Sequence, residues 1–184
     1  MNFFKKTRID WHHRQLEQLV KTRKTKHQST AFKHIKSVGV LFDASNLKER
    51  EEALRFVKEL KDSGKKVRVM AFLNEKEKID NLPFVHFSQQ EVDFFYRPKS
   101  TETQEFISKD FDVLLNLSPT NNIHLEYIAA LSRAHYRVGA ATTKMYCYEL
   151  MIDSQPSTSV KNYIKQISFF LNKMHSSRAG NIPA

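Results

Sequence analysis

Short apolar runs alternate along this chain with longer segments in which apolar residues recur at helical spacing. The first run extends from Val38 to Asp43 and stays apolar up to its final carboxylate, as expected for a buried strand of a parallel sheet. Four later runs have a similar length and composition: 67–73, 83–87, 112–117 and 136–139. The pattern therefore predicts about five strands.

The segments between these runs carry apolar residues at intervals of three and four, which is typical of helices with one buried face. The expected helices are 46–62, 101–109, 123–134 and 157–174. Asn46 is a favourable N-cap, and Gly64 follows the end of the same helix. Two apolar stretches stay open: 94–96 as strand or buried loop, and 145–152 as a further strand of unspecified position.

Strands that alternate with helices imply right-handed crossovers and a sheet covered on both faces. The expected fold class is α/β, with one three-layer doubly wound, Rossmann- or flavodoxin-like, mostly parallel sheet of about five strands. A basic N-terminal helix precedes it. We expect a basic N-terminal arm over 1–36, a sandwich domain over 37–175 and a disordered tail over 176–184. The helix of the arm is expected over about 10–23, with Trp11 packed against the domain.

The positive charge is concentrated in this arm. The whole chain carries a formal net charge of +10, whereas residues 1–36 contain ten Lys and Arg against Asp10 and Glu17 and so carry +8. Such a cluster attracts polyanions by releasing their counterions, and RNA is the most abundant polyanion of the cytosol. The expected phosphate contacts are Lys5, Lys6, Arg8, Arg14, Lys21, Arg23, Lys24 and Lys26. An acidic protein, an anionic membrane and plain solvation are the alternatives for the same charge.

Cysteine content and hydropathy exclude several classes of protein. Cys147 is the single cysteine, so the chain has no internal disulfide partner and no thiolate zinc cluster, and we expect a buried, inert thiol. The first residues develop no signal-peptide core, and no run approaches the length of a membrane span. These observations predict a cytoplasmic protein.

Polar residues follow two of the predicted strands, at the edge where open α/β sheets bind ligands. They are Asp43, Ser45 and Asn46 after the first strand, and Ser118, Thr120, Asn121 and Asn122 after the strand at 112–117. Together they could hold a nucleotide or a sugar phosphate on two helix N-termini, although helix caps require the same residue types without any ligand. The turn after Asp43 lacks glycine, so no dinucleotide or P-loop motif is present. No catalytic residue, metal site or cofactor is predicted.

Four segments of the second half resemble a known family. They are Phe111–Ser118, Tyr127–Ala134, Arg137–Gly139 and Tyr148–Ile152. Over roughly residues 35–175 the chain is similar to a family of small uncharacterised α/β proteins from Bacteroidota, and the basic N-terminal helix fits as well. The resemblance implies the fold and a bacterial cytosolic setting, and it assigns no activity to any residue.

The leading functional hypothesis is a non-catalytic RNA-binding protein, associated with the ribosome or its assembly, whose arm contacts phosphates. The alternative is a small-ligand binding protein or enzyme with its pocket at the strand ends around Asp43 and Ser118–Asn122. A third interpretation is a scaffold whose arm docks on an acidic protein partner.

Overall fold

The structure is a computed structural model that describes residues 3–22, 35–75, 82–144, 146–155 and 157–179. Its centre is a six-stranded sheet in which every pair of neighbours is parallel, with the order β3-β2-β1-β4-β5-β6. The strands are β1 (Ser37–Asp43), β2 (Lys66–Leu73), β3 (His86–Ser88), β4 (Val113–Asn116), β5 (Arg137–Ala140) and β6 (Leu150–Ile152).

The strand order is that of a doubly wound Rossmann-type sheet. The chain runs outward from β1 through β2 to β3, returns to β4 on the other side of β1, and continues to β5 and β6. The expected α/β fold class is confirmed. The sixth strand, β6, is the end of the apolar stretch 145–152 that sequence left unplaced, and it extends the sheet at the edge beside β5.

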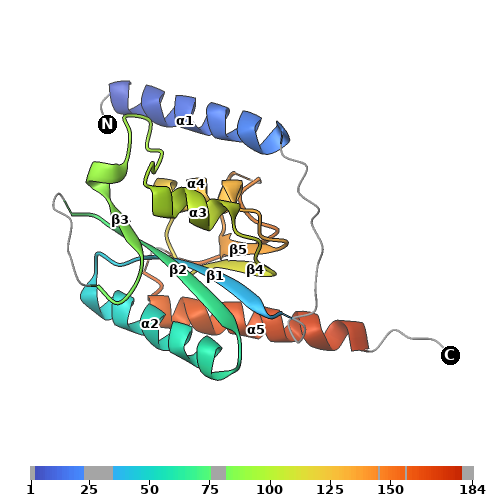
Figure 1. Ribbon diagram of the computed structural model, residues 1–184. Coiled ribbons are helices and arrows are strands. Elements are labelled where there is room, and N and C mark those ends of the chain that lie inside the picture. The colour runs from blue at the N-terminus through green and yellow to red at the C-terminus, as the bar shows by residue number, and fades with distance from the viewer. Residues whose placement is uncertain (1–2, 23–34, 76–81, 145, 156, 180–184) are drawn as a thin grey trace.

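Helices cover both faces of the sheet (Figure 1). On one face lie α2 (Leu47–Asp62) and α5 (Val160–Ala179), which contact each other and share a buried cluster with the sheet. On the other face lie α3 (Thr101–Ser108) and α4 (Ile123–Leu131), whose apolar residues form the second buried cluster. The N-cap expected at Asn46 is present, with its side chain accepting from Glu49 N at 3.2 Å.

The N-terminal helix α1 (Phe3–Thr22) forms an additional layer outside α3 and α4, as Figure 1 shows. It contacts α4, and Leu16 belongs to the buried cluster on that face of the sheet. The helix begins at Phe3, seven residues before the expected start at residue 10. No proline or glycine interrupts residues 3–9, so nothing local stops the helix from extending over them.

Several element boundaries also differ from the sequence-based expectation. Strand β3 is confined to His86–Ser88, since Pro83 has no amide hydrogen for a sheet ladder. Helix α4 ends at Leu131 because Ser132 is extended. Helix α5 continues five residues past its expected end at residue 174. It includes residues 176–179, which were expected to belong to a disordered tail. The rest of that tail, residues 180–184, lies outside the described residues.

Candidate nucleic-acid interface

One side of α1 is committed to packing on the domain. Leu16 is 1 % exposed and His12 is also buried, whereas Trp11 stacks on Phe95 with 3.8 Å between ring centroids. The packing role expected for Trp11 is therefore confirmed. The N-terminal segment is a fixed layer of the domain over residues 3–22, and its outward residues are held at defined positions.

The inward side of α1 is anchored by the loop at 92–98, which begins and ends with a bridge between Val92 and Pro98. Three consecutive carbonyl oxygens of this loop accept hydrogen bonds from other elements. Arg8 Nε donates to Phe94 O at 2.9 Å and His12 Nδ1 donates to Phe95 O at 2.6 Å, both from α1. His124 Nδ1 donates to Tyr96 O at 3.1 Å from α4. The loop thus joins α1 to α4 through its backbone.

Asp93 holds the loop in shape from within. Its carboxylate accepts from the backbone N–H of Phe95 at 2.8 Å and of Arg97 at 3.0 Å, and it forms an ion pair with the Arg97 guanidinium. Burial raises the pKa of Asp93, but these hydrogen bonds outweigh burial and lower the pKa below its usual value. Tyr96 has a φ of 62°, a left-handed conformation that is unfavourable for a bulky side chain. The loop is therefore strongly constrained.

The eight cations expected to contact phosphate divide into three groups. Lys5, Lys6, Arg14 and Lys21 are exposed on α1. Arg8 is half-buried, with its guanidinium carbon 4.0 Å from the centroid of the Phe94 ring and 4.4 Å from that of Tyr96. The positions Arg23, Lys24 and Lys26 lie outside the described residues.

Two acids share the outward side of α1 with these cations. Asp10 is exposed, and Glu17 pairs with Lys21 at 2.9 Å. The hydrogen bond from Lys21 is the main reason that the pKa of Glu17 is lowered. Within the described helix the five cations exceed the two acids by three charges, so the other five of the eight positive charges lie in residues 23–36.

Beneath α1 lies a group of buried ionisable side chains that sequence analysis did not single out. Glu126 of α4 is 4 % exposed, and burial raises its pKa to about 7. Burial lowers the pKa of His13 to about 4 and also lowers that of His12. Cys147 is buried as expected, and its pKa is raised to about 12. The two histidines and the thiol are therefore neutral at pH 7, whereas the Glu126 carboxyl group changes its charge near that pH.

A groove of about 590 Å³ opens between α1 and the loop that follows β5. It is lined by Asp10, His13, Arg14, Glu17, Thr143, Lys144 and Tyr146. Its charged residues are two acids and Arg14 on α1, and Lys144 on the loop. The groove therefore has no strong preference for a ligand of either sign.

The strand-end residues meet where β1 and β4 end side by side, at the switch in strand order. Asp43 is the centre of the group: one carboxylate oxygen accepts from Ser45 N at 3.0 Å, and the other accepts from Asn122 Nδ2 at 3.0 Å. The backbone N–H of Asp43 donates to Ser118 Oγ at 3.1 Å. The structure thus brings Asp43, Ser45, Ser118 and Asn122 together.

These strand-end groups bind one another. Asn46 Oδ1 caps α2, and Asn122 Oδ1 caps α4 through the N–H groups of His124 and Leu125. Thr120 and Asn121 are exposed beside them. The arrangement ties the turns after β1 and β4 together, which is the structural role that helix caps already explain.

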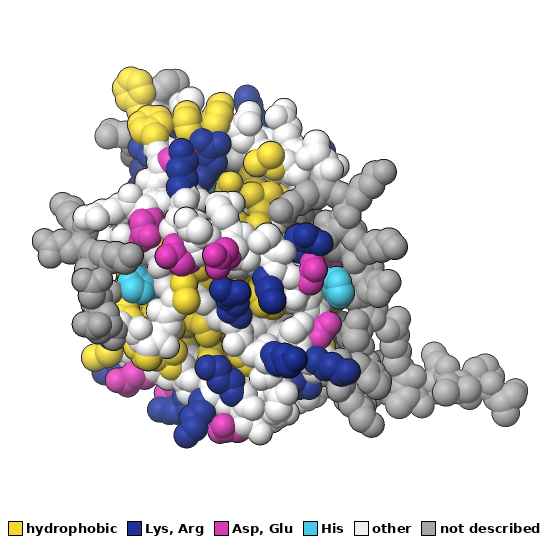
Figure 2. All heavy atoms as spheres, in the orientation of Figure 1, with side chains coloured by type: hydrophobic (Ala, Val, Ile, Leu, Met, Phe, Trp, Pro, Cys, Tyr) yellow, Lys and Arg dark blue, Asp and Glu magenta, His cyan; other side chains and the backbone are white. Residues whose placement is uncertain are grey.

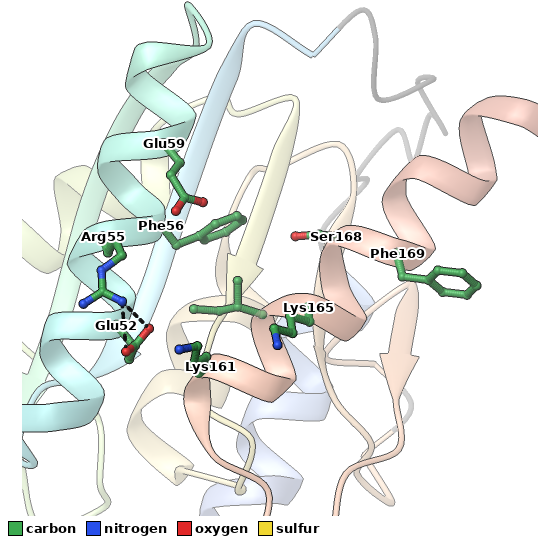
Figure 3. Close-up of a pocket in the computed structure, with 9 residues that line it drawn as sticks. Glu52, Arg55, Phe56, Glu59, Lys161, Lys165, Ser168 and Phe169 are labelled. Carbon is green, nitrogen blue, oxygen red and sulfur yellow. Dashed lines mark hydrogen bonds and ion pairs between the residues drawn. The ribbon is translucent and has the colours of Figure 1, made fainter.

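A further groove of about 440 Å³ lies between α2 and α5 (Figure 3), on the opposite face of the sheet from α1 (Figure 1). Phe56 and Ile164 form its apolar floor. Glu52, paired with Arg55 at 3.1 Å, lines the α2 side, and Lys161 and Lys165 line the α5 side. The charges on its two walls complement each other, so the groove presents mixed polarity to a ligand.

Two kinds of feature are not found among the described residues. Among them, no group of three or more His, Cys, Asp or Glu side chains is placed to hold a metal ion. None of the helices in these ranges combines the length and apolar character needed to cross a bilayer.

The exposure of Phe94 is the feature that sequence reasoning missed. The apolar run 94–96 was expected as strand or buried loop, yet Phe94 is 64 % exposed at the tip of the loop. Phe4, one turn before Arg8 on α1, is 81 % exposed. An available signal was the position of this run between charged Asp93 and Arg97, with no apolar neighbour to extend it.

Comparison with known proteins places this fold in a family. The comparisons with curated proteins and with solved structures gave no match. A family model described as a family of unknown function, DUF6913, matches residues 8–174, which include most of α1 and the whole sheet. The expected resemblance to a family without an assigned activity is confirmed, and the chain belongs to the family of unknown function DUF6913.

Proposed function

We propose that this protein binds RNA through the outward side of α1 and the basic segment that follows it. The observation that carries the proposal is the position of the charge: residues 1–36 carry +8 of the total +10, and residues 18–36 contain six cations and no acid. Because phosphate contacts depend mainly on such charge, they position a protein on RNA without reading its sequence. The protein acts here as a binding module and not as an enzyme.

The rigid placement of α1 supports this proposal. Binding by a disordered arm carries the entropic cost of ordering it, whereas the exposed Lys5, Lys6, Arg14 and Lys21 already lie along one docked helix. A helix of this length extends over about 30 Å, which is enough for several consecutive phosphates. The Glu17–Lys21 pair reduces the charge near the C-terminal end of the helix, so Lys5 and Lys6 at its N-terminal end contribute most.

The basic surface continues where the chain enters the sheet. Lys36 precedes β1, and Lys66 begins β2 directly beside it, since Ser37 and Lys66 are register partners. Both lysines are exposed, as is Lys109 before β4. Figure 2 shows Lys and Arg side chains gathered on the lower right of the molecule, where β1 and β2 begin in Figure 1. The amino ends of these parallel strands therefore extend the proposed RNA surface.

The decisive measurement is the salt dependence of RNA affinity. We expect labelled single-stranded RNA to bind with a strong dependence on salt between about 50 and 200 mM. The triple variant Lys6→Gln, Arg14→Gln, Lys21→Gln should bind more weakly and reduce the slope of log K against log salt by about 2, because each phosphate contact on single strands contributes about 0.7.

A matched control removes the same charge from the opposite face. Lys58 of α2 and Lys161 and Lys165 of α5 are exposed, and changing all three to Gln should leave the slope unchanged. Equal effects of the two triple variants would show attraction by net charge alone, and absence of binding at low salt would refute the proposal.

Association with the ribosome or its assembly particles is the more specific form of this proposal. We expect the full chain to co-sediment with ribosomal particles from a lysate at low salt and to be released by high salt or nuclease. Co-sedimentation that survives nuclease would indicate an acidic protein partner instead.

A further inference from the structure

Two exposed aromatic side chains and several cations lie together where α1 begins. Phe94 is 64 % exposed at the tip of loop 92–98, and Phe4 is 81 % exposed at the start of α1. Arg8 connects them: it follows Phe4 by one helical turn, and its guanidinium lies 4.0 Å from the Phe94 ring centroid. Figure 2 shows hydrophobic and basic side chains next to each other at the upper left of the molecule, where these segments lie in Figure 1.

The loop is built so that Phe94 points outward while its neighbour points inward. Phe95 packs under Trp11, whereas Phe94 and Phe95 meet edge to face with 5.2 Å between centroids. The left-handed Tyr96 and the Asp93 hydrogen bonds enforce this reversal of the chain. A left-handed backbone conformation at a bulky residue persists only where surrounding contacts hold it in place, and such conformations are concentrated at functional sites. Phe94 is therefore held in an exposed position by an ordered loop.

The charges around Phe94 favour an anionic partner. Lys5 and Lys6 are exposed on the first turns of α1, where no acid precedes Asp10. Lys99 is exposed on the far side of the loop, and the one acid of the loop, Asp93, is already neutralised by Arg97 and Lys99. An apolar protein surface would gain nothing from these cations, whereas a polymer that combines aromatic faces with phosphates would use both features.

We propose that Phe94, supported by Arg8 and flanked by Phe4, is a stacking platform for an unpaired base of single-stranded RNA. Bases stack on aromatic rings and guanidinium planes, while neighbouring lysines contact the backbone on either side. Lys5 and Lys6 supply these backbone contacts. Duplex RNA keeps its bases stacked inside the helix and cannot use the platform. The inference rests on the proposed RNA binding and specifies its substrate as single-stranded.

The test compares a labelled oligouridine with a blunt RNA duplex of similar phosphate number, with the full chain and fluorescence anisotropy. Phe94→Ala should weaken oligouridine binding at least about fivefold, which is the lower limit expected for stacking one base, and leave duplex binding unchanged. Phe94→Trp should restore binding to at least the original level. Both variants should keep the melting temperature, because the side chain is largely exposed.

Phe169→Ala is the matched control. Phe169 is 60 % exposed on α5 and also lies near a cation, with Lys173 Nζ 5.9 Å from its ring centroid. This variant should bind both RNAs like the original protein. If it weakens oligouridine binding as much as Phe94→Ala does, exposed aromatics act non-specifically and the platform is refuted.

The remaining outcomes separate the platform from the proposed function. Salt-dependent binding of both RNAs that Phe94→Ala does not change would leave RNA binding intact and overturn the platform. Absence of binding to either RNA would overturn both. Binding to vesicles with anionic lipid, weakened by Phe94→Ala in the absence of RNA binding, would identify the same residues as a membrane contact and overturn the platform in favour of that surface.

Discussion

The docking of α1 on the domain can be tested by removing one side chain. Leu16 is 1 % exposed and lies in the buried cluster that also contains Leu125 and Ile128 of α4. Leu-to-Ala changes at packed sites destabilise by about 2–5 kcal/mol. Because α1 is an outer layer whose neighbours can relax, we expect Leu16→Ala to weaken its docking by about 2–3 kcal/mol.

Proteolysis measures this change directly. A tenfold change in population corresponds to about 1.4 kcal/mol, so the fraction of molecules with α1 released should rise by roughly 30- to 140-fold. When opening and closing are faster than cleavage, the cleavage rate follows that fraction. We therefore expect trypsin to cut after Arg14, in the middle of α1, faster by a similar factor in Leu16→Ala.

Leu19→Ala provides the control on the same helix. Leu19 is 42 % exposed, and its replacement should change docking by no more than about 0.5 kcal/mol. Equal cleavage rates in the two variants would refute the assignment of Leu16 as the docking residue. An equal acceleration of cleavage after Lys58 of α2 would show that the whole domain opens and that α1 has no separate opening step.

Three further predictions concern side chains buried on the same side of the sheet. The pKa of Glu126 is raised to about 7, so its neutral carboxyl group stabilises the fold below pH 4.5, and this contribution is lost as pH rises through 7. Glu126→Gln should therefore reduce the fall in melting temperature between pH 5 and 8. Arg137→Met removes the 2.5 Å pair with Glu149 and the donors to the last carbonyls of α4, and denaturant titration should show a loss of about 3–5 kcal/mol. Gly139→Ala would place a Cβ 2.4 Å from the Tyr148 ring, and we expect a loss of about 1–3 kcal/mol in the same titration.

Each of these predictions has an outcome that contradicts it. For Glu126, an unchanged pH dependence in the Gln variant would show that its carboxyl titrates as if exposed. For Arg137, the double variant with Glu149→Gln should be more stable than the single one, because the half-buried Glu149 carboxylate, whose charge the guanidinium balanced, becomes a neutral amide. Equal stability would argue against the pair. For Gly139, wild-type stability would mean that the Tyr148 ring moves aside freely.

Local patterns were sufficient to predict the regular elements of the sheet. The continuous apolar run at β1, the cap at Asn46 and the spacing along α5 each reflect contacts within a few residues along the chain. The alternation of these elements also determined the α/β class, because parallel strands need crossovers and crossovers cover both faces. The concentration of charge in residues 1–36 and the single cysteine required only counting.

Tertiary structure decided how these elements and side chains are used. The sequence assigned Arg8 to phosphate, whereas contact with loop 92–98 turns it onto Phe94. It could not distinguish Phe94 from Phe95, although one is exposed and the other lies under Trp11.

The strand order and the position of α1 outside α4 were likewise not predicted, since both depend on surfaces far apart in the sequence. The spacing of apolar residues shows which face of a helix or strand they share. What that side meets is determined by partners more than eighty residues away, as for His12 and the carbonyl of Phe95. Such pairings depend on the packing of the whole chain, and for this reason only the three-dimensional structure reveals them.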